Sequence, residues 1–227
     1  MPRETFDREL SQLEAEVVLM SGMVENAIFS SLAALSERDL DRSRAVIDED
    51  DRIDEKEEDI ESSCIEIIRR EAPIASDLRR VIAVLHIAGE LERIGDYAEG
   101  IGKISLMMGT QPPLKKLVDI PRMGEIAVSM LKRALEAYLD RDSQSVEQKV
   151  RGLAPDDDAV DDLYKRVLQD LIALMKQNPD NVERATYLLW VAHNIERVAD
   201  RATNIAEQAL YQATGQKVNL GEEEHVV

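Results

Sequence analysis

The sequence predicts an all-α protein, with two tandem three-helix bundles related by internal duplication and six long helices in all. Three observations support this fold class. Apolar residues recur at three- and four-residue steps along most of the 227-residue chain, which is the spacing of one buried helix face. Strand signals are nearly absent, because aromatic residues make up only 4% of the chain and no long stretch alternates apolar and polar residues. The third observation is that the second half of the chain repeats the first.

The first half contains three expected helices, at about Phe6–Leu35, Leu40–Arg70 and Ser76–Met108. Each has an apolar residue on nearly every turn, and each apolar stripe needs partners on more than one side, which predicts a bundle. Pro73 ends the second helix, since proline disfavours helical geometry in the residue before it. Gly109 ends the third, because glycine readily adopts the left-handed conformation that often follows a helix.

The second half follows a connection that a helix does not cross easily. Pro112, Pro113 and Pro121 lie in it, and proline removes a backbone donor that a helix interior needs. Three further helices are expected: one ending near Tyr138, one from Asp142 to Lys176 with a break at Gly152–Pro155, and one from Val182 to Ala213. The predicted organisation is a first bundle at residues 1–109, a linker at 110–121, a second bundle at 122–215 and a frayed tail at 216–227.

The duplication is clearest in the third helix of each half. Glu92-Arg-Ile-Gly-Asp96 aligns with Glu196-Arg-Val-Ala-Asp200, an offset of 104 residues. The second helices align at an offset of 107 and the first helices at an offset of 103. The change from 103 to 107 indicates four extra residues in the fifth helix, where the Gly152–Pro155 break interrupts the helical pattern. Because the gaps coincide with helix breakers, the duplication is credible.

The composition narrows the choice of partners. Acidic residues outnumber basic ones 46 to 28, for a formal net charge of -18. Nucleic-acid binding needs clustered Lys and Arg, so that class is disfavoured, and cations or a basic surface of a partner protein are favoured. The N-terminus lacks the apolar segment of a signal peptide, and the longest apolar run, Tyr187–Ala192, is far shorter than the ~20 residues of a membrane span. We therefore expect a cytoplasmic protein that reaches a membrane only through a partner.

Acidic pairs spaced four residues apart occur at duplicated positions in the second and third helices of both halves. Residues four apart lie one turn apart on the same face. These acids border the apolar stripes, so carboxylates from two helices would be crowded and partly desolvated, a cost that a bound cation removes. Oxygen ligands suit Mg²⁺, Mn²⁺ or ferric iron. Alternatively, Arg93, Arg197 and other bases could neutralise the acids in salt bridges. The candidate ligands are Asp50, Asp54, Glu92 and Asp96 in the first half, and Asp157, Asp161, Glu196 and Asp200 in the second.

These motifs resemble those of the PhoU family over nearly the whole chain, from Phe6 to about Tyr211. The resemblance rests on the doubled Glu-Arg-x-x-Asp motif together with Asp50-x-x-x-Asp54 and Asp157-x-x-x-Asp161. It implies two three-helix bundles that bind metal ions, including multinuclear clusters, through the eight acids. It also implies a homodimeric negative regulator of phosphate metabolism rather than an enzyme. Such a regulator contacts the ATP-binding subunit of the phosphate ABC transporter and a sensor histidine kinase.

Two rival functions stay open. A carboxylate-bridged di-iron enzyme would need Glu-x-x-His on core helices, and the one match is Glu222-x-x-His225 in the tail. A metal-free helical adaptor is the stronger rival. The metal itself is open among Mg, Mn, Fe and Zn. The sequence departs from the family motif at Gly100, where asparagine is common. The second half retains Asn204 at that place, so the two sites could differ in affinity.

Overall fold

The computed structural model describes residues 2–220, with side chains from residue 4 onward. The first half folds into α1 (Pro2–Glu37), α2 (Leu40–Glu71) and α3 (Ala75–Met108). The predicted stops are confirmed. α2 ends before Pro73, with Ala72 in the left-handed region at a φ of 43°. α3 ends at Gly109, whose φ of 61° suits a residue without a Cβ.

The second half has the same order with one interruption. Its elements are α4 (Asp119–Leu139), α5 (Ser143–Arg151), α6 (Ala154–Gln177), a 3₁₀ turn η1 (Pro179–Asn181) and α7 (Val182–Thr214). The predicted break in the fifth helix is confirmed, since α5 and α6 are separate. Pro155 lies in the first turn of α6. Backbone N–H groups there form no hydrogen bond within the helix, so a residue without an N–H fits. The predicted linker extends too far, because α4 begins at Asp119 and accommodates Pro121 in its first turn for the same reason.

The start of the predicted frayed tail packs against the helices. The Leu220 amide donates a hydrogen bond to Glu207 Oε1 at 2.7 Å, and Val218 and Leu220 contact the core. The tail is therefore packed as far as Leu220. Residues 221–227, which include the Glu222-x-x-His225 sequence, lie outside the described part of the chain.

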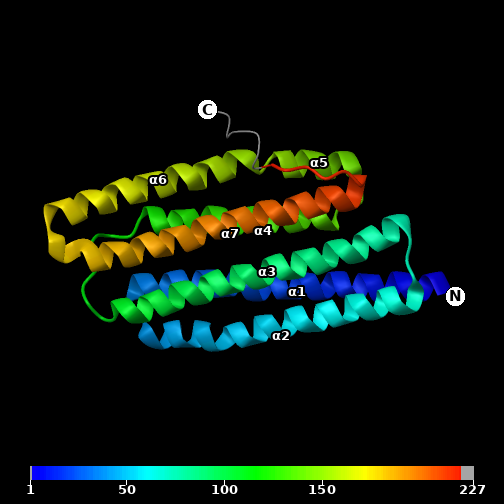
Figure 1. Ribbon diagram of the computed structural model, residues 1–227, viewed down its shortest axis with the longest axis horizontal. Coiled ribbons are helices and arrows are strands. Elements are labelled where there is room, and N and C mark those ends of the chain that lie inside the picture. Colours follow the sequence, from blue (N-terminus) through cyan, green and yellow to red (C-terminus); the bar gives the residue numbers. More distant parts are fainter. Residues whose placement is uncertain (1, 221–227) are drawn as a thin grey trace.

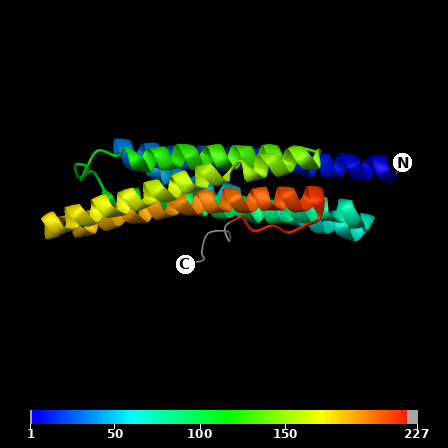
Figure 2. The same cartoon turned by 90° about the horizontal axis from the view of Figure 1, so that it is seen from above.

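The helices run along one long axis of an elongated molecule (Figure 1). α2 and α6 lie at opposite edges, and α3 and α7 lie side by side between them (Figure 1). Seen from above, α1 and α4 lie together on one side of this layer (Figure 2). One apolar core extends through both repeats. The two three-helix repeats therefore share a core, with α3 against α7 and α1 against α4.

One described helix, spanning Glu4–Glu37, is long and apolar enough by length and composition to cross a membrane. Polar residues interrupt its apolar positions, so it contains no long uninterrupted apolar run. Half of its most apolar window is buried against the rest of the protein. Leu10, Val17 and Ile28 on this helix are completely buried. These residues are part of the shared core of the bundle.

The contact between the repeats explains the departure at Gly100. α3 and α7 run antiparallel (Figure 1), and Arg201 and Asn204 of α7 both donate to Glu90 Oε2, at 3.2 and 3.1 Å. At the duplicated place, a Cβ on Gly100 would lie 2.9 Å from Asn194 Nδ2. Glycine at position 100 thus makes room for Asn194. The Gly100/Asn204 difference concerns packing between the repeats, and Asn204 contacts α3 instead of an acidic cluster.

A buried carboxylate also joins the two repeats. Glu14 of α1 is only 7% exposed. Its Oε1 accepts a hydrogen bond from Arg80 of α3 at 2.9 Å, and its Oε2 accepts one from Arg141 at 2.6 Å. Arg141 lies in the α4–α5 connection, so this charge-assisted arrangement spans both halves of the chain. Each oxygen of the carboxylate has its own guanidinium partner, as a buried charge requires.

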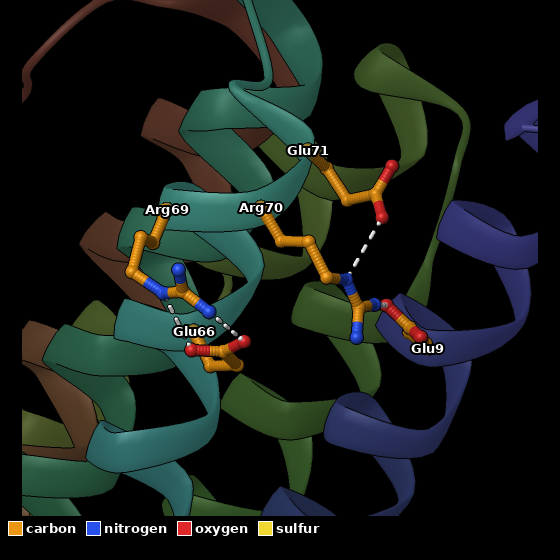
Figure 3. A network of polar contacts seen from close by, with 5 residues as sticks. All are labelled: Glu9, Glu66, Arg69, Arg70 and Glu71. Carbon is orange, nitrogen blue, oxygen red and sulfur yellow. Dashed lines mark hydrogen bonds and ion pairs between the residues drawn. The ribbon is translucent and has the colours of Figure 1, made fainter.

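Ion pairs at the surface connect α1 to α2. Arg70, near the end of α2, pairs with Glu9 of α1 and with Glu71, while Arg69 binds Glu66 through two hydrogen bonds (Figure 3). Such exposed pairs contribute little to stability because solvent screens them. They border an open groove of about 510 Å³ between α1 and α2.

Candidate metal centre

Three carboxylates converge where α2 packs against α3. Asp50 of α2 and Asp96 and Glu99 of α3 each offer one oxygen, and the three oxygens lie within 4.8 Å of one another. Asp50 is buried, Glu99 is half-buried and Asp96 is exposed, so the group is open to solvent on one side. Within the described residues, no other group of three His, Cys, Asp or Glu side chains converges as closely. The first acidic cluster is defined by these three residues together with Asp54 and Glu92.

Gly95 allows the two helices to approach at this point. A Cβ on Gly95 would lie 3.0 Å from Asp50 Oδ1 and 3.1 Å from Ile53 Cγ2. The Asp50 carboxylate therefore occupies space that any larger residue at position 95 would fill. Ile53, one turn after Asp50, is 2% exposed and belongs to the core. Because α2 buries Ile53 on this face, it also holds Asp50 at the edge of the core, against the acids of α3.

The crowding changes how these carboxylates titrate. Burial is the largest cause that raises the pKa of Asp50 to about 7, and the charges of Asp54, Glu99 and Asp96 add to it. Burial also raises the pKa of Glu92 and of Asp96, again with help from Asp54. Ionised carboxylates are therefore unfavourable in the protein alone, and a bound cation would stabilise them.

Few bases neutralise the first acidic cluster. Lys103 pairs with Glu99, and no other base of the described residues lies within ion-pair distance of the cluster. Arg93, which the sequence offered as an alternative partner, is exposed and forms no ion pair among the described side chains. Salt bridges therefore do not account for Asp50, Asp54, Glu92 and Asp96.

The second acidic cluster consists of Asp157, Asp161, Glu196 and Asp200, at the equivalent place between α6 and α7. Burial, then Asp200 and Asp161, raise the pKa of Asp157 to about 6. Burial, then Asp200, raise the pKa of Glu196 to about 7. Burial also raises the pKa of Asp200, although Arg197 opposes this rise. The duplicated acids thus meet a similar environment in both repeats.

The second cluster is partly neutralised from within. Arg197 donates a hydrogen bond to Asp200 Oδ2 at 2.5 Å. His193 Nδ1 lies 3.3 Å from Glu196 Oε2, but this buried oxygen has no hydrogen-bond partner among the described residues. An arginine therefore neutralises Asp200, whereas Glu196 has only His193 nearby, and its Oε2 has no hydrogen-bond partner among the described residues.

Sequence reasoning missed Glu99. It lies three residues after Asp96, so both face the same side of α3, but it does not belong to a pair spaced four residues apart. At the offset of 104 its counterpart is Thr203, which opposes the rise in the pKa of Asp157. The first cluster therefore has one carboxylate more than the second. This difference, rather than Gly100 and Asn204, distinguishes the two clusters.

The fold and the clusters define a duplicated three-helix-bundle protein with a carboxylate cluster between the second and third helices of each repeat. The PhoU domain matches residues 17–105 and, a second time, residues 120–209. The chain belongs to the PhoU family, as the motifs indicated.

Known relatives match over almost the whole chain. The Phosphate-specific transport system accessory protein PhoU homolog of Caulobacter vibrioides is 36% identical over 216 residues, which cover 95% of this chain and 92% of the relative. The homolog of Clostridium acetobutylicum is 33% identical over 223 residues, 98% of this chain and all of the relative. The phosphate transport system regulatory protein PhoU from Streptococcus pneumoniae has a similar crystal structure, with a TM-score of 0.86 and 29% identity, covering 95% of this chain and 100% of that one. PhoU from Pseudomonas aeruginosa gives the same TM-score and identity over 93% of this chain and 100% of its own.

Proposed function

We propose that this chain is a cytoplasmic, metal-binding regulator of phosphate uptake and of phosphate-starvation signalling. The phosphate part is supported by relatives that are named accessory or regulatory proteins of phosphate transport. The metal part is supported chiefly by one observation, the convergence of Asp50, Asp96 and Glu99 within 4.8 Å beside a single base.

The first acidic cluster fits a hard cation. Its donors are all carboxylate oxygens, which Mg²⁺, Mn²⁺ and ferric iron prefer and which Zn²⁺ also accepts. Asp50, Asp96 and Glu99 would bind the ion. Asp54 and Glu92 are close enough to affect the pKa of the others and would complete the set or hold a further ion of a multinuclear cluster. The ion would supply positive charge where the protein alone has almost none.

The second acidic cluster would bind a metal more weakly. Asp157, Asp161, Glu196 and Asp200 provide four carboxylates, but Arg197 already binds Asp200. A metal ligand at Asp200 would have to displace this guanidinium. The unsatisfied Glu196 oxygen is the strongest indication that this cluster also takes a cation.

The regulator would act through its surface and not by catalysis. A metal that joins α2 to α3, and another that joins α6 to α7, would stiffen each repeat and fix the shape of its outer helices. The proposed partners are the ATP-binding subunit of the phosphate ABC transporter and a sensor histidine kinase, contacted by a homodimer. The net charge of -18 favours basic surfaces on these partners. Through these partners the protein would inhibit phosphate uptake and repress the starvation response when phosphate is plentiful.

Elemental analysis after dialysis tests the metal part. Wild-type protein is compared with the Asp96→Asn/Asp200→Asn double variant and with Asp51→Asn, which removes a charge from an exposed position of α2 next to the cluster. We expect bound metal and a chelator-sensitive melting temperature in the wild type and in Asp51→Asn, and neither in the double variant. Absence of metal from the wild type, with melting indifferent to chelator and to added ions, would overturn this part.

A deletion strain tests the regulatory part separately. Loss of the gene should leave a phosphate-starvation reporter active in phosphate-rich medium, and the wild-type gene should silence it. If the metal is needed for regulation, the double variant should fail to do so at normal protein levels. Full silencing by a metal-free variant would instead support the second candidate, a metal-free helical adaptor, which the Arg197–Asp200 pair also favours.

A further inference from the structure

The duplication repeats a pair of arginines outside the acidic clusters. At the offset of 104 Arg80 corresponds to Arg184, and at the offset of 103 Arg38 corresponds to Arg141. Arg80 and Arg141 converge on the two oxygens of Glu14, at 2.9 and 2.6 Å. The first pair is therefore neutralised by a carboxylate, and it serves as an internal template for the second.

The end of α1 and the start of α7 lie at the other end of the bundle, beside the α3–α4 connection (Figure 1). Arg38 follows α1, and its Nη1 lies 3.8 Å from Met108 Sδ at the end of α3. Arg184 lies in the first turn of α7 and donates a hydrogen bond to the Pro112 carbonyl. The charge of Arg184 acts on Arg38. Burial first, and then this charge, lower the pKa of the Arg38 guanidinium.

Within the described part of the chain, this second pair has no acidic partner. Among the side chains of residues 4–220, no carboxylate lies within ion-pair distance of Arg38 or Arg184, and the buried Nε of Arg38 has no hydrogen-bond partner. The physical reason is the shorter first helix of the second repeat, since α1 has 36 residues and α4 has 21. The position equivalent to Glu14 falls in the connection, at Leu117. Two neighbouring positive charges are thus left unpaired among the described side chains, although the chain has 46 acidic residues.

We propose that Arg38 and Arg184 form a binding site for a small oxyanion of the inorganic phosphate type. The template pair places one guanidinium on each oxygen of a carboxylate, and guanidinium groups bind phosphate oxygens through the same charge-assisted hydrogen bonds. Two positive charges match a dianion. The N-terminus of α7, where Arg184 lies, adds partial positive charge. This inference does not depend on metal binding by the acidic clusters.

A bound anion would connect parts of both repeats. Arg38 belongs to the α1–α2 connection and contacts Met108 at the end of α3, while Arg184 belongs to α7 and binds Pro112 in the α3–α4 connection. At the opposite end of the bundle, the Glu14 carboxylate takes the place of such an anion by binding Arg80 and Arg141. The proposed site would therefore make the attachment between the repeats depend on anion concentration at one end of the bundle.

Calorimetric titration of the full chain with inorganic phosphate tests the site. Wild-type protein is compared with Arg38→Gln, with Arg184→Gln and with Arg122→Gln, which removes an exposed arginine of α4 that pairs with Glu125. The buffer contains a chelator, so that phosphate cannot bind through a metal, and its ionic strength is fixed because salt screens such contacts. We expect one saturable event that each of the first two variants weakens at least about tenfold and the control leaves unchanged. No saturable binding, or equal binding in all variants, would overturn the proposal.

A second measurement needs no substitution at the site. Phenylglyoxal modification of the wild type, mapped by mass spectrometry, should be slowed by phosphate at Arg38 and Arg184 but not at Arg122. Sulfate should protect as phosphate does, and acetate at the same ionic strength should protect less. Equal protection by acetate, or no protection by phosphate, would contradict a site for a dianion.

Discussion

Replacing Asp50 with asparagine should stabilise the metal-free protein above neutral pH. Burial and the neighbouring acids raise the pKa of Asp50 from 3.8 to about 7, so the folded protein resists ionisation of this carboxylate. Asparagine has nearly the same shape and no charge. It would keep the close contact with Gly95 while removing the repulsion from Asp96 and Glu99.

The two pKa values set the sign and the size of the effect. Between pH 3.8 and about 7 the folded state keeps a proton on Asp50 that the unfolded chain has released, so stability falls as the pH rises through this window. A shift of about 3 pKa units corresponds to at most ~4 kcal/mol. This cost is absent below the unfolded pKa and fully developed above the folded pKa. A bound cation would remove it by neutralising the carboxylate.

Denaturant unfolding in the presence of a chelator measures the effect. Asp50→Asn should exceed the wild type in free energy of unfolding by up to ~4 kcal/mol near pH 8, and by less than half of that near pH 5. Saturating Mg²⁺ should stabilise the wild type and shrink or reverse the difference. Asp51→Asn is the matched control, because Asp51 is the exposed neighbour on the same helix. Equal stability of wild type and Asp50→Asn at both pH values would refute the reasoning, and an equal gain in Asp51→Asn would reduce it to a general effect of net charge.

Three further predictions concern the packing around the site and between the repeats. Gly95→Ala should destabilise by about 1–3 kcal/mol because its Cβ would crowd α2. Gly89→Ala on the same helix meets nothing within 4 Å and should stabilise by roughly 0.5–1 kcal/mol. Glu14→Gln should cost about 1–3 kcal/mol, because it removes the buried countercharge of the half-buried Arg80 and of the exposed Arg141. Gly100→Ala should be more favourable by about 0.5–1 kcal/mol in an Asn194→Ala background than in the wild type, because the Asn194 amide occupies the space that the new methyl group needs.

Thermal or denaturant unfolding measures all three, and each has a contrary outcome. Equal effects of the alanine substitutions at positions 95 and 89 would show that α2 does not approach α3 as closely as described. A Glu14→Gln variant as stable as the wild type would mean that the two arginines find other partners. Strict additivity at positions 100 and 194 would show that the two residues do not touch.

The sequence predicted the helices and their ends because the signals for both are local. Gly109 and the Gly152–Pro155 break act on the backbone within one or two turns, so neither needs knowledge of the rest of the fold. Pro121 was placed wrongly because the same residue fits a linker or a first helical turn, and only packing decides which. The acids of both clusters other than Glu99 could be identified, because the duplication presents them twice at fixed helical spacing.

What the sequence by itself determined was the all-helical class, the two repeats and the positions of the paired acids. Tertiary structure decided which side chains meet, since contacts between helices depend on how their axes cross and not on spacing within one chain segment. In the folded protein Glu99 lies in the first acidic cluster and Arg197 binds Asp200 in the second. Glu14 binds one arginine pair, Arg80 and Arg141. Among the described residues, the other pair, Arg38 and Arg184, has no carboxylate partner, because the first helix of the second repeat begins too late to supply one.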